Sequence, residues 1–352
     1  MKHKKLIVIA LSVAAALTML VAAFAQSAGA TYTLLATVPL PADSAGKLLT
    51  SWDITWVDPG TGRFFITNRT TTKGGGRIDV VDTQTNKFLY SVPSTKGEIG
   101  FTGTTPATTP GCTISGPNGV VAVPYLNQLY VGDGNATVKV VDLAARAVVA
   151  VIPTGGNCRA DELGYDPLDH IIMIASPDDR PPFVTFISTD SQTILGQYTY
   201  TGRMGGLEQP VYSALTQKFY ITVPGIGVGG TGSVDVFDPI TMKLENSYAI
   251  GCSPAGLVLT PAQTLWTSCG AALTVNGSQV ATITGQGDQI WYNSADNRVY
   301  FTTNVVDAAT NQVIGTLPGV SPGRVNPAAD SSNGHVFAPV SQKGINVYSS
   351  GR

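Results

Sequence analysis

The chain has 352 residues and a formal net charge of −2 at pH 7, from 21 Lys and Arg against 23 Asp and Glu. Only 12% of the residues are charged, whereas 39 are glycine and 22 are proline, which is typical of a compact β-rich protein. Because the chain has no basic surplus, nucleic acid is not an expected partner.

The N-terminal segment has the pattern of a secretory signal peptide. Three lysines among the first five residues precede an apolar run from Leu6 to Phe24, and the sequence then becomes small and polar. We therefore expect residues 1–30 to be a signal peptide, and residues 31–352 to form a single secreted or periplasmic domain. A retained membrane anchor is the alternative, but the run is barely long enough to span a bilayer. No second apolar stretch reaches that length.

The rest of the chain repeats two kinds of short β-rich segment. The first kind follows a turn rich in Asp, Pro, Gly or Asn and recurs at Phe64–Asn68, Leu129–Asp133, Phe219–Val223 and Val299–Thr303. The second kind ends in an aspartate and recurs at Ile78–Asp82, Val138–Asp142 and Val234–Asp238. Alternation at period two, in short strands joined by tight turns, predicts antiparallel four-stranded sheets at the spacing of propeller blades.

Alignment of the repeats gives seven units. Their inner strands are expected to start near Trp52, Pro117, Ala160, Leu207, Pro254, Gly287 and Arg324. The last unit supplies only three strands, whereas Tyr32–Leu40 forms a lone strand before the first unit. The sequence therefore predicts an all-β, seven-bladed β-propeller in which the N-terminal strand completes the last blade and closes the ring.

The repeat is similar to that of a known family. The segments Phe65–Asn68 and Tyr130–Asp133, each followed by a Val-Val-Asp strand, resemble the YVTN-type β-propeller repeat, and the likeness extends over nearly the whole mature chain. The resemblance implies a periplasmic or cell-surface propeller. Many members of that family have no assigned reaction, so the resemblance implies fold and location more than chemistry. The fifth and seventh units depart from the motif at Leu265–Cys269 and Val336–Pro339.

One face of the predicted propeller carries the long connections, and we call it the loop-rich face. Its insertions are Pro41–Ser51, Arg69–Gly76, Thr95–Ser115, Pro177–Pro182 and Pro224–Gly232. The opposite, tight-turn face carries short turns. Because long loops on a rigid scaffold usually carry binding, we expect a protein, glycan or small ligand to bind the loop-rich face.

All four cysteines map to the loop-rich face. An even number in an exported chain, with no C-x-x-C spacing, indicates two disulfides rather than a metal or redox motif. Cys112 and Cys158 lead into adjacent blades at comparable points, and Cys252 and Cys269 flank the inner hairpin of one blade. The sequence therefore predicts that Cys112 pairs with Cys158 and that Cys252 pairs with Cys269.

The third position of each aligned inner strand is usually an oxygen-bearing residue. In ring order these positions are Asp53, Asn118, Asp161, Glu208, Ala255, Asp288 and Val325. Carboxylates that converge at the mouth of the axial channel either have raised pKa values or require a cation. Oxygen ligands favour calcium, so the candidate metal ligands are Asp53, Asn118, Asp161, Glu208 and Asp288.

Other interpretations of these oxygen-bearing residues stay open. The acids could accept backbone hydrogen bonds from neighbouring blades, or lie in a solvated channel where arginines neutralise them. A register slip of one residue would also place Glu162 where Asp161 is expected. The candidate ligand-binding residues on this face are Trp52, Arg159, Arg203 and Arg324.

A second resemblance concerns the same ring. Gly116–Val120, followed by Leu129–Asp133, is similar to the segment that supplies a metal-binding asparagine in gluconolactonase-type propellers. The resemblance implies that Asn118 is a metal ligand. It also implies, as an alternative function, a divalent-metal-dependent lactonase or esterase with the metal at the channel mouth.

The sequence offers little for other chemistry, and no catalytic residue is assigned. His170 and His335 fall in turns of the tight-turn face, and no serine-hydrolase, zincin or phosphate-loop motif occurs. Trp52, Trp56 and Trp291 could form an aromatic ligand platform, although packing between blades is the commoner role. The expected function is a binding or scaffold module that acts through the loop-rich face, with the lactonase as the alternative.

Overall fold

The computed structural model of the protein describes residues 30–350, except 44, 70–73, 95–97, 203–204, 226, 228, 286, 303 and 321–325. The expected signal peptide therefore lies outside the described residues, apart from Ala30. No helix in the described part of the chain has both the length and the apolar character needed to cross a membrane.

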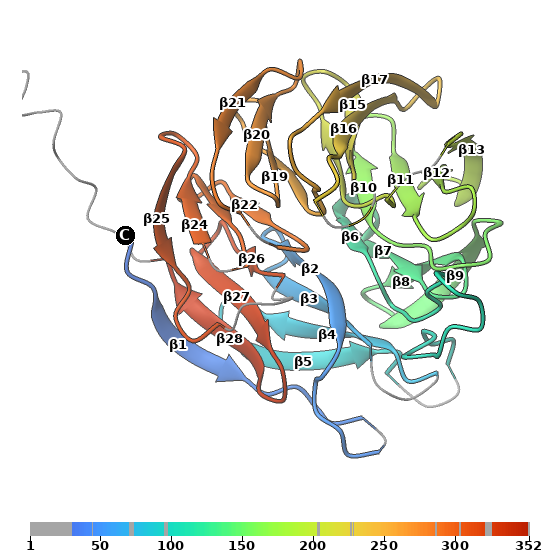
Figure 1. The fold of residues 1–352 in the computed structure, drawn as a ribbon. Helices are drawn as coiled ribbons and strands as arrows, with labels where there is room; N and C mark the ends of the chain where they lie inside the picture. Colours follow the sequence, from blue (N-terminus) through green and yellow to red (C-terminus); the bar gives the residue numbers. More distant parts are fainter. Residues whose placement is uncertain are drawn as a thin grey trace, which may run out of the picture.

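The described residues form seven antiparallel sheets of four strands, arranged as blades around an axis (Figure 1). The inner strands of blades 1 to 7 are β2 (Trp52–Asp58), β6 (Val120–Val123), β10 (Leu163–Asp166), β14 (Pro210–Ser213), β18 (Leu257–Leu259), β22 (Trp291–Asn293) and β26 (Ala328–Ala329). The second strands are β3 (Arg63–Asn68), β7 (Gln128–Asp133), β11 (Ile171–Ser176), β15 (Lys218–Val223), β19 (Thr264–Thr267), β23 (Arg298–Tyr300) and β27 (His335–Val340).

The remaining strands lie on the outside of each blade. The third strands are β4 (Arg77–Asp82), β8 (Thr137–Asp142), β12 (Phe183–Ser188), β16 (Ser233–Asp238), β20 (Ala271–Thr274), β24 (Asn304–Asp307) and β28 (Gly344–Ser349). The outer strands are β5 (Lys87–Val92), β9 (Ala147–Pro153), β13 (Thr193–Thr199), β17 (Lys243–Ala249), β21 (Gln279–Thr282), β25 (Gln312–Thr316) and β1 (Thr33–Val38). The predicted seven-bladed propeller is confirmed.

The N-terminal strand closes the ring as the sequence predicts. β1 pairs antiparallel with β28, with Leu34 opposite Tyr348 and Val38 opposite Ile345. In Figure 1 the blue N-terminal strand therefore runs beside the red C-terminal strands. This pairing gives the backbone of β28 hydrogen-bond partners on both sides and covers an edge that would otherwise be open to another chain.

The aspartate that ends the third strand has a local structural role. Asp82 accepts hydrogen bonds from the backbone N–H groups of Gln84 (3.0 Å) and Thr85 (2.7 Å), and Asn86 then closes the turn with φ 56°. The same type of contact starts the turns after β8, β16 and β24. The recurring Val-Val-Asp pattern thus combines a buried strand with the cap of the tight turn that follows it.

The core consists of apolar clusters between adjacent blades. Seven such clusters occur in the described residues, one for each junction of the ring. At the closing junction the rings of Phe64 and Phe337 are stacked at 5.1 Å, and between blades 3 and 4 the rings of Phe186 and Phe219 lie 6.4 Å apart. Each blade therefore buries both of its faces against its neighbours, which is the main stabilising contribution in this fold.

The expected starts of the inner strands need a correction. Six of the seven begin three or four residues later than expected, at the bounds given above, and only β2 starts at the expected Trp52. The preceding residues are lead-in segments that contact the next blade, as shown by the N–H of Gly119, which donates to the carbonyl of Asp161 at 3.2 Å. A Cβ at Gly119 or Gly132 would clash with that carbonyl, so the close approach requires glycine. The segment expected to be a strand as far as Thr303 ends at Tyr300, since the tight turn to β24 begins there.

Candidate functional site

The lead-in segments surround the mouth of the axial channel on the loop-rich face. Asp53 lies near the start of β2, whereas Asn118, Asp161, Glu208 and Asp288 precede β6, β10, β14 and β22 by two or three residues. Burial, followed by the charges of Asp161, Asp288 and Asp53, raises the pKa of Glu208 well above its usual range. The structure thus brings the sequence-predicted carboxylates together around one mouth.

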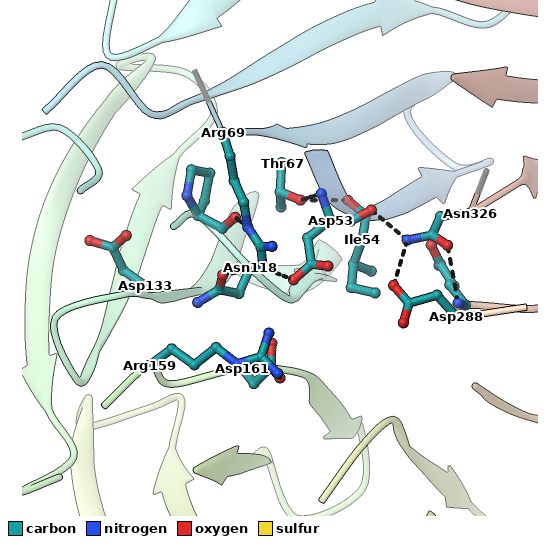
Figure 2. Close-up of polar contacts among 12 residues, drawn as sticks. Asp53, Ile54, Thr67, Arg69, Asn118, Asp133, Arg159, Asp161, Asp288 and Asn326 are labelled. Atoms are coloured by element: carbon teal, nitrogen blue, oxygen red, sulfur yellow. Dashed lines mark hydrogen bonds and ion pairs between the residues drawn. The ribbon is translucent and has the colours of Figure 1, made fainter. Parts of the chain in front are cut away.

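Arg69 links blades 1 and 2 at this mouth, and Asn118 extends the link to blade 3. Its guanidinium contacts the carboxylate of Asp53 and the side-chain oxygen of Asn118, and its Nε donates to the carbonyl of Pro117 at 3.1 Å (Figure 2). The side-chain nitrogen of Asn118 in turn donates to the carbonyl of Ala160 at 2.9 Å. Arg69 is only 7% exposed, so a buried guanidinium neutralises Asp53 and fixes the orientation of Asn118.

A second arginine lies on the neighbouring blade. Arg159 forms ion pairs with Asp161 at 2.9 Å and with Asp178 at 3.2 Å. Asp178 belongs to the loop between β11 and β12, and its carboxylate also accepts the N–H of Thr113 at 3.1 Å. Arg159 therefore connects the channel mouth to two of the long loops of the loop-rich face.

Asn326 fills the place in the ring that blade 7 contributes. Its side-chain nitrogen donates to the carbonyl of Asp53 at 2.7 Å and to the carboxylate of Asp288 at 3.2 Å, and its side-chain oxygen accepts the N–H of Gln289 at 3.2 Å (Figure 2). The sequence alignment named Val325 for blade 7, and Val325 lies outside the described residues. Asn326 has φ 50°, a left-handed conformation that asparagine adopts more readily than most residues.

Glu162 adds a buried carboxylate to the mouth. From the sequence, Glu162 was expected there only if the alignment register was wrong by one residue. Both Asp161 and Glu162 are buried, at 2% and 4% exposure, so both belong to the mouth. Burial, followed by the charges of Glu208, Asp161, Asp288 and Asp53, raises the pKa of Glu162 well above its usual range. The Oε2 atom of Glu162 is buried and has no hydrogen-bond partner among the residues that the structure describes.

Two opposing effects act on the pKa of Asp161. Burial raises the pKa of Asp161 to about 7, although Arg159 acts in the other direction. The described mouth therefore holds two paired acids, Asp53 and Asp161, together with the pair Glu162 and Glu208, which repel one another. This arrangement favours either carboxyl protonation or a cation brought by a partner.

Three of the five predicted calcium ligands are in contact with arginines. Arg69 contacts Asp53 and Asn118, and Arg159 contacts Asp161. Among the residues that the structure describes, no group of three or more His, Cys, Asp or Glu side chains is placed to hold one metal ion. The arginine pairs agree with the alternative in which arginines neutralise the acids, and the calcium site stays a prediction.

The loops around the mouth are tied to the blades. Both predicted disulfides form, between Cys112 and Cys158 and between Cys252 and Cys269. The connection between β5 and β6 is held further by Asp133, which is fully buried and accepts the N–H of Thr102 at 3.1 Å. Asp133 also forms a buried ion pair with Lys139, whose ammonium contacts the carbonyl of Gly100.

The four ligand-binding candidates named from the sequence differ in where they lie. Trp52 is buried at 9% exposure and packs in the cluster between blades 7 and 1, which is the packing role that the sequence offered as its alternative. Arg159 lies at the mouth, whereas Arg203 and Arg324 lie outside the described residues. The role of Arg69 was not predicted from the sequence, although its position directly after a repeated strand, at the start of a long loop, was a usable signal.

Comparison with solved structures supports the architecture. One similar structure is a chain of hydrazine synthase from Kuenenia stuttgartiensis, with a TM-score of 0.67 and 13% sequence identity over 85% of this chain and 95% of that chain. The protein has a β-propeller fold. At this identity the similarity shows the fold alone and gives no information on activity. No family model and no curated protein matches the sequence, so the YVTN-type and gluconolactonase-type resemblances depend on their motifs only.

Proposed function

We propose that this propeller is an exported, non-catalytic binding module that takes a positively charged group of its partner into the acidic mouth of the channel. The two disulfides and the N-terminal signal pattern support an extracytoplasmic location. A lysine or arginine side chain of a protein, or the ammonium group of a small molecule, has the required chemistry.

The buried carboxylate of Glu162 is the observation that carries this proposal. A buried carboxylate oxygen without a hydrogen-bond partner is costly, and among the described residues the charges that act most strongly on Glu162 are those of other acids. An ammonium or guanidinium group placed between Glu162 and Glu208 would offset their mutual repulsion through N–H donors, which calcium lacks, and would let both ionise. Among the described residues, the ion pairs of Arg69 and Arg159 go to Asp53, Asp161 and Asp178, and Arg159 acts on Glu208 only from a longer distance.

A hollow beside Glu208 gives a partner access to the mouth. A cavity of about 370 Å³ lies on the loop-rich face and is lined by Glu208, Pro224, Ser253, Pro254, Ala255, Ser268, Cys269, Gly285 and Gly287. The disulfide between Cys252 and Cys269 borders this hollow and fixes its wall. A preorganised wall lowers the ordering cost of binding.

Binding of fluorescein-labelled hexalysine, followed by fluorescence anisotropy, tests the proposal. Glu162→Gln and Glu208→Gln should each weaken binding by about tenfold or more, since each removes one of the two carboxylates that would contact the ammonium group. Binding to the wild type should also tighten from about pH 5 to about pH 8, as the raised-pKa carboxyls ionise.

Glu245→Gln is the matched control, because it removes the same charge from the outer strand β17, where Glu245 pairs with Lys218. Equal weakening by Glu245→Gln would show that only net charge matters and would overturn the proposal. Equal binding of Nε-acetylated hexalysine would overturn it as well.

A further inference from the structure

A second cavity lies at the other end of the axial channel. It has a volume of about 430 Å³ and is lined by residues from the inner strands of blades 1 to 6, from β2 to β22. The inner strands run from the loop-rich face to the tight-turn face, and the lining includes Pro167 and Ala214 in turns of the tight-turn face. The cavity therefore opens opposite the acidic mouth.

The lining is aromatic and carries no charged side chain among its residues. Five half-buried aromatic residues contribute to it: Trp56, Tyr165, Tyr212, Trp291 and Tyr292. The two tryptophans meet edge to face, with ring centroids 5.3 Å apart. Aromatic rings that stay half-exposed around a concave space are a binding surface for other aromatic groups.

The short inner strand of blade 7 accounts for the position of the tryptophans. β26 contains only Ala328 and Ala329, so Trp56 of blade 1 and Trp291 of blade 6 can meet across it. The indole N–H of Trp291 donates to the carbonyl of Ala329 at 3.1 Å. With its polar atom engaged by blade 7, Trp291 offers the cavity its apolar ring.

One polar group reaches the inner part of the cavity. Gln209 follows Glu208 of the acidic mouth, lines the cavity and is 8% exposed. Its side-chain oxygen accepts the N–H of Leu257 at 3.0 Å, which fixes the orientation of the amide. The Nε2 amide group of Gln209 is then a donor that remains for a ligand.

We propose that this cavity binds a small uncharged aromatic molecule that carries one hydrogen-bond acceptor. The volume falls within the range of about 300–1,000 Å³ typical of small-molecule sites. The aromatic walls select a flat apolar ligand, the absence of lining charges excludes an ion, and Gln209 specifies the acceptor. This site is separate from the acidic mouth and does not depend on the function proposed for it.

The test uses Prodan, an uncharged naphthalene ketone whose emission shifts to the blue in an apolar site. The wild type should give a saturable blue shift at a stoichiometry of one. Tyr212→Ala should weaken binding by about tenfold, because it removes one aromatic wall, and Ala214→Arg should do so by obstructing the opening. Tyr125→Ala is the matched control, since Tyr125 is an exposed aromatic residue of the tight-turn face that does not line the cavity.

Gln209→Glu tests the polar contact separately. The substituted side chain keeps an oxygen for the N–H of Leu257 but loses the amide donor, so Prodan should bind about tenfold more weakly, whereas naphthalene, which has no acceptor, should lose less. Naphthalene binding is measured by displacement of Prodan. Unsaturable binding, or equal affinity in the wild type, Tyr212→Ala and Ala214→Arg, would overturn the proposal.

Discussion

The side-chain amide of Gln289 forms two hydrogen bonds with the backbone of Thr55, which lies 234 residues earlier in the chain. Its oxygen accepts the N–H of Thr55 at 2.8 Å, and its nitrogen donates to the carbonyl of Thr55 at 2.6 Å. This contact joins blade 6 directly to blade 1 across the two-residue inner strand of blade 7. The ring is thus closed twice, by β1 on the outside and by Gln289 at the axis.

The inner closure should contribute measurably to stability. Gln289→Leu would leave the N–H and C=O of Thr55 without their partner at a site where both residues are fully buried. We expect the free energy of unfolding to fall by about 2–6 kcal/mol, from the cost of about 1–3 kcal/mol for each of the two unsatisfied buried groups. Urea unfolding measures this change. Gln279→Leu, on an exposed outer strand, is the control, and an equally small effect of both variants would show that the contact at the axis adds little.

The two disulfides should stabilise the fold to different extents. They close loops with sequence separations of 46 and 17 residues. Restriction of the unfolded chain gives about 4 kcal/mol for the Cys112 to Cys158 bridge and about 3 kcal/mol for the Cys252 to Cys269 bridge. Urea unfolding of the two double serine variants should rank them in this order. The reverse order would mean that contacts in the folded loops outweigh the effect on the unfolded chain.

Much of the fold could be predicted because its determinants are local. The alternation of strands such as Phe64–Asn68 and the capping contact of Asp82 depend on neighbouring residues, and both repeat along the chain. The closing strand was predictable by counting, since one unit lacked a strand that Tyr32–Leu40 could supply. The regular spacing of these local signals was therefore sufficient to predict the propeller.

The details of the candidate site depend on contacts between distant residues. Arg69 lies in a loop, and no local pattern shows that its guanidinium contacts Asp53 and Asn118. The position of Asn326 depends on its left-handed conformation and on partners in blades 1 and 6. The sequence could indicate which blades supply polar groups, but not which acids are already paired.

The acidic mouth should make stability depend on pH. The folded-state pKa values of Glu162 and Glu208 are raised above their values in the unfolded chain, so the folded protein binds more protons than the unfolded chain between those values. Stability from this source is present below the ordinary glutamate pKa of about 4.3 and is lost as the pH rises through the raised values. The wild type should therefore become less stable from about pH 4 to about pH 8 in comparison with a variant that lacks one of these acids.

Replacing each glutamate with glutamine separates its contribution to the pH dependence of stability from that of the other acids. Glu162→Gln should raise the free energy of unfolding at about pH 8 and change it little at about pH 4, because the amide cannot carry the charge whose burial is unfavourable. Glu208→Gln should act in the same direction but less strongly, since this side chain is half-buried. Urea unfolding at both pH values measures the change, with Glu245→Gln as the exposed control. A Glu162→Gln variant that is destabilised at both pH values would show that the carboxylate is already stabilised by a partner.

The effect of calcium on the melting temperature distinguishes two states of the mouth: acids neutralised by arginines, or acids that bind a metal ion. Arg69 and Arg159 already contact three of the five predicted ligands, so millimolar CaCl₂ should raise the melting temperature of the wild type no more than NaCl at equal ionic strength, and EDTA should not lower it. Arg69→Met removes the guanidinium that contacts Asp53 and Asn118. Calcium should then stabilise this variant more than the wild type, because a ligand that binds only the folded state raises stability. A calcium-dependent rise in the wild type that EDTA reverses would instead show that the ring binds metal beside its arginines, and the lactonase alternative would have to be tested directly.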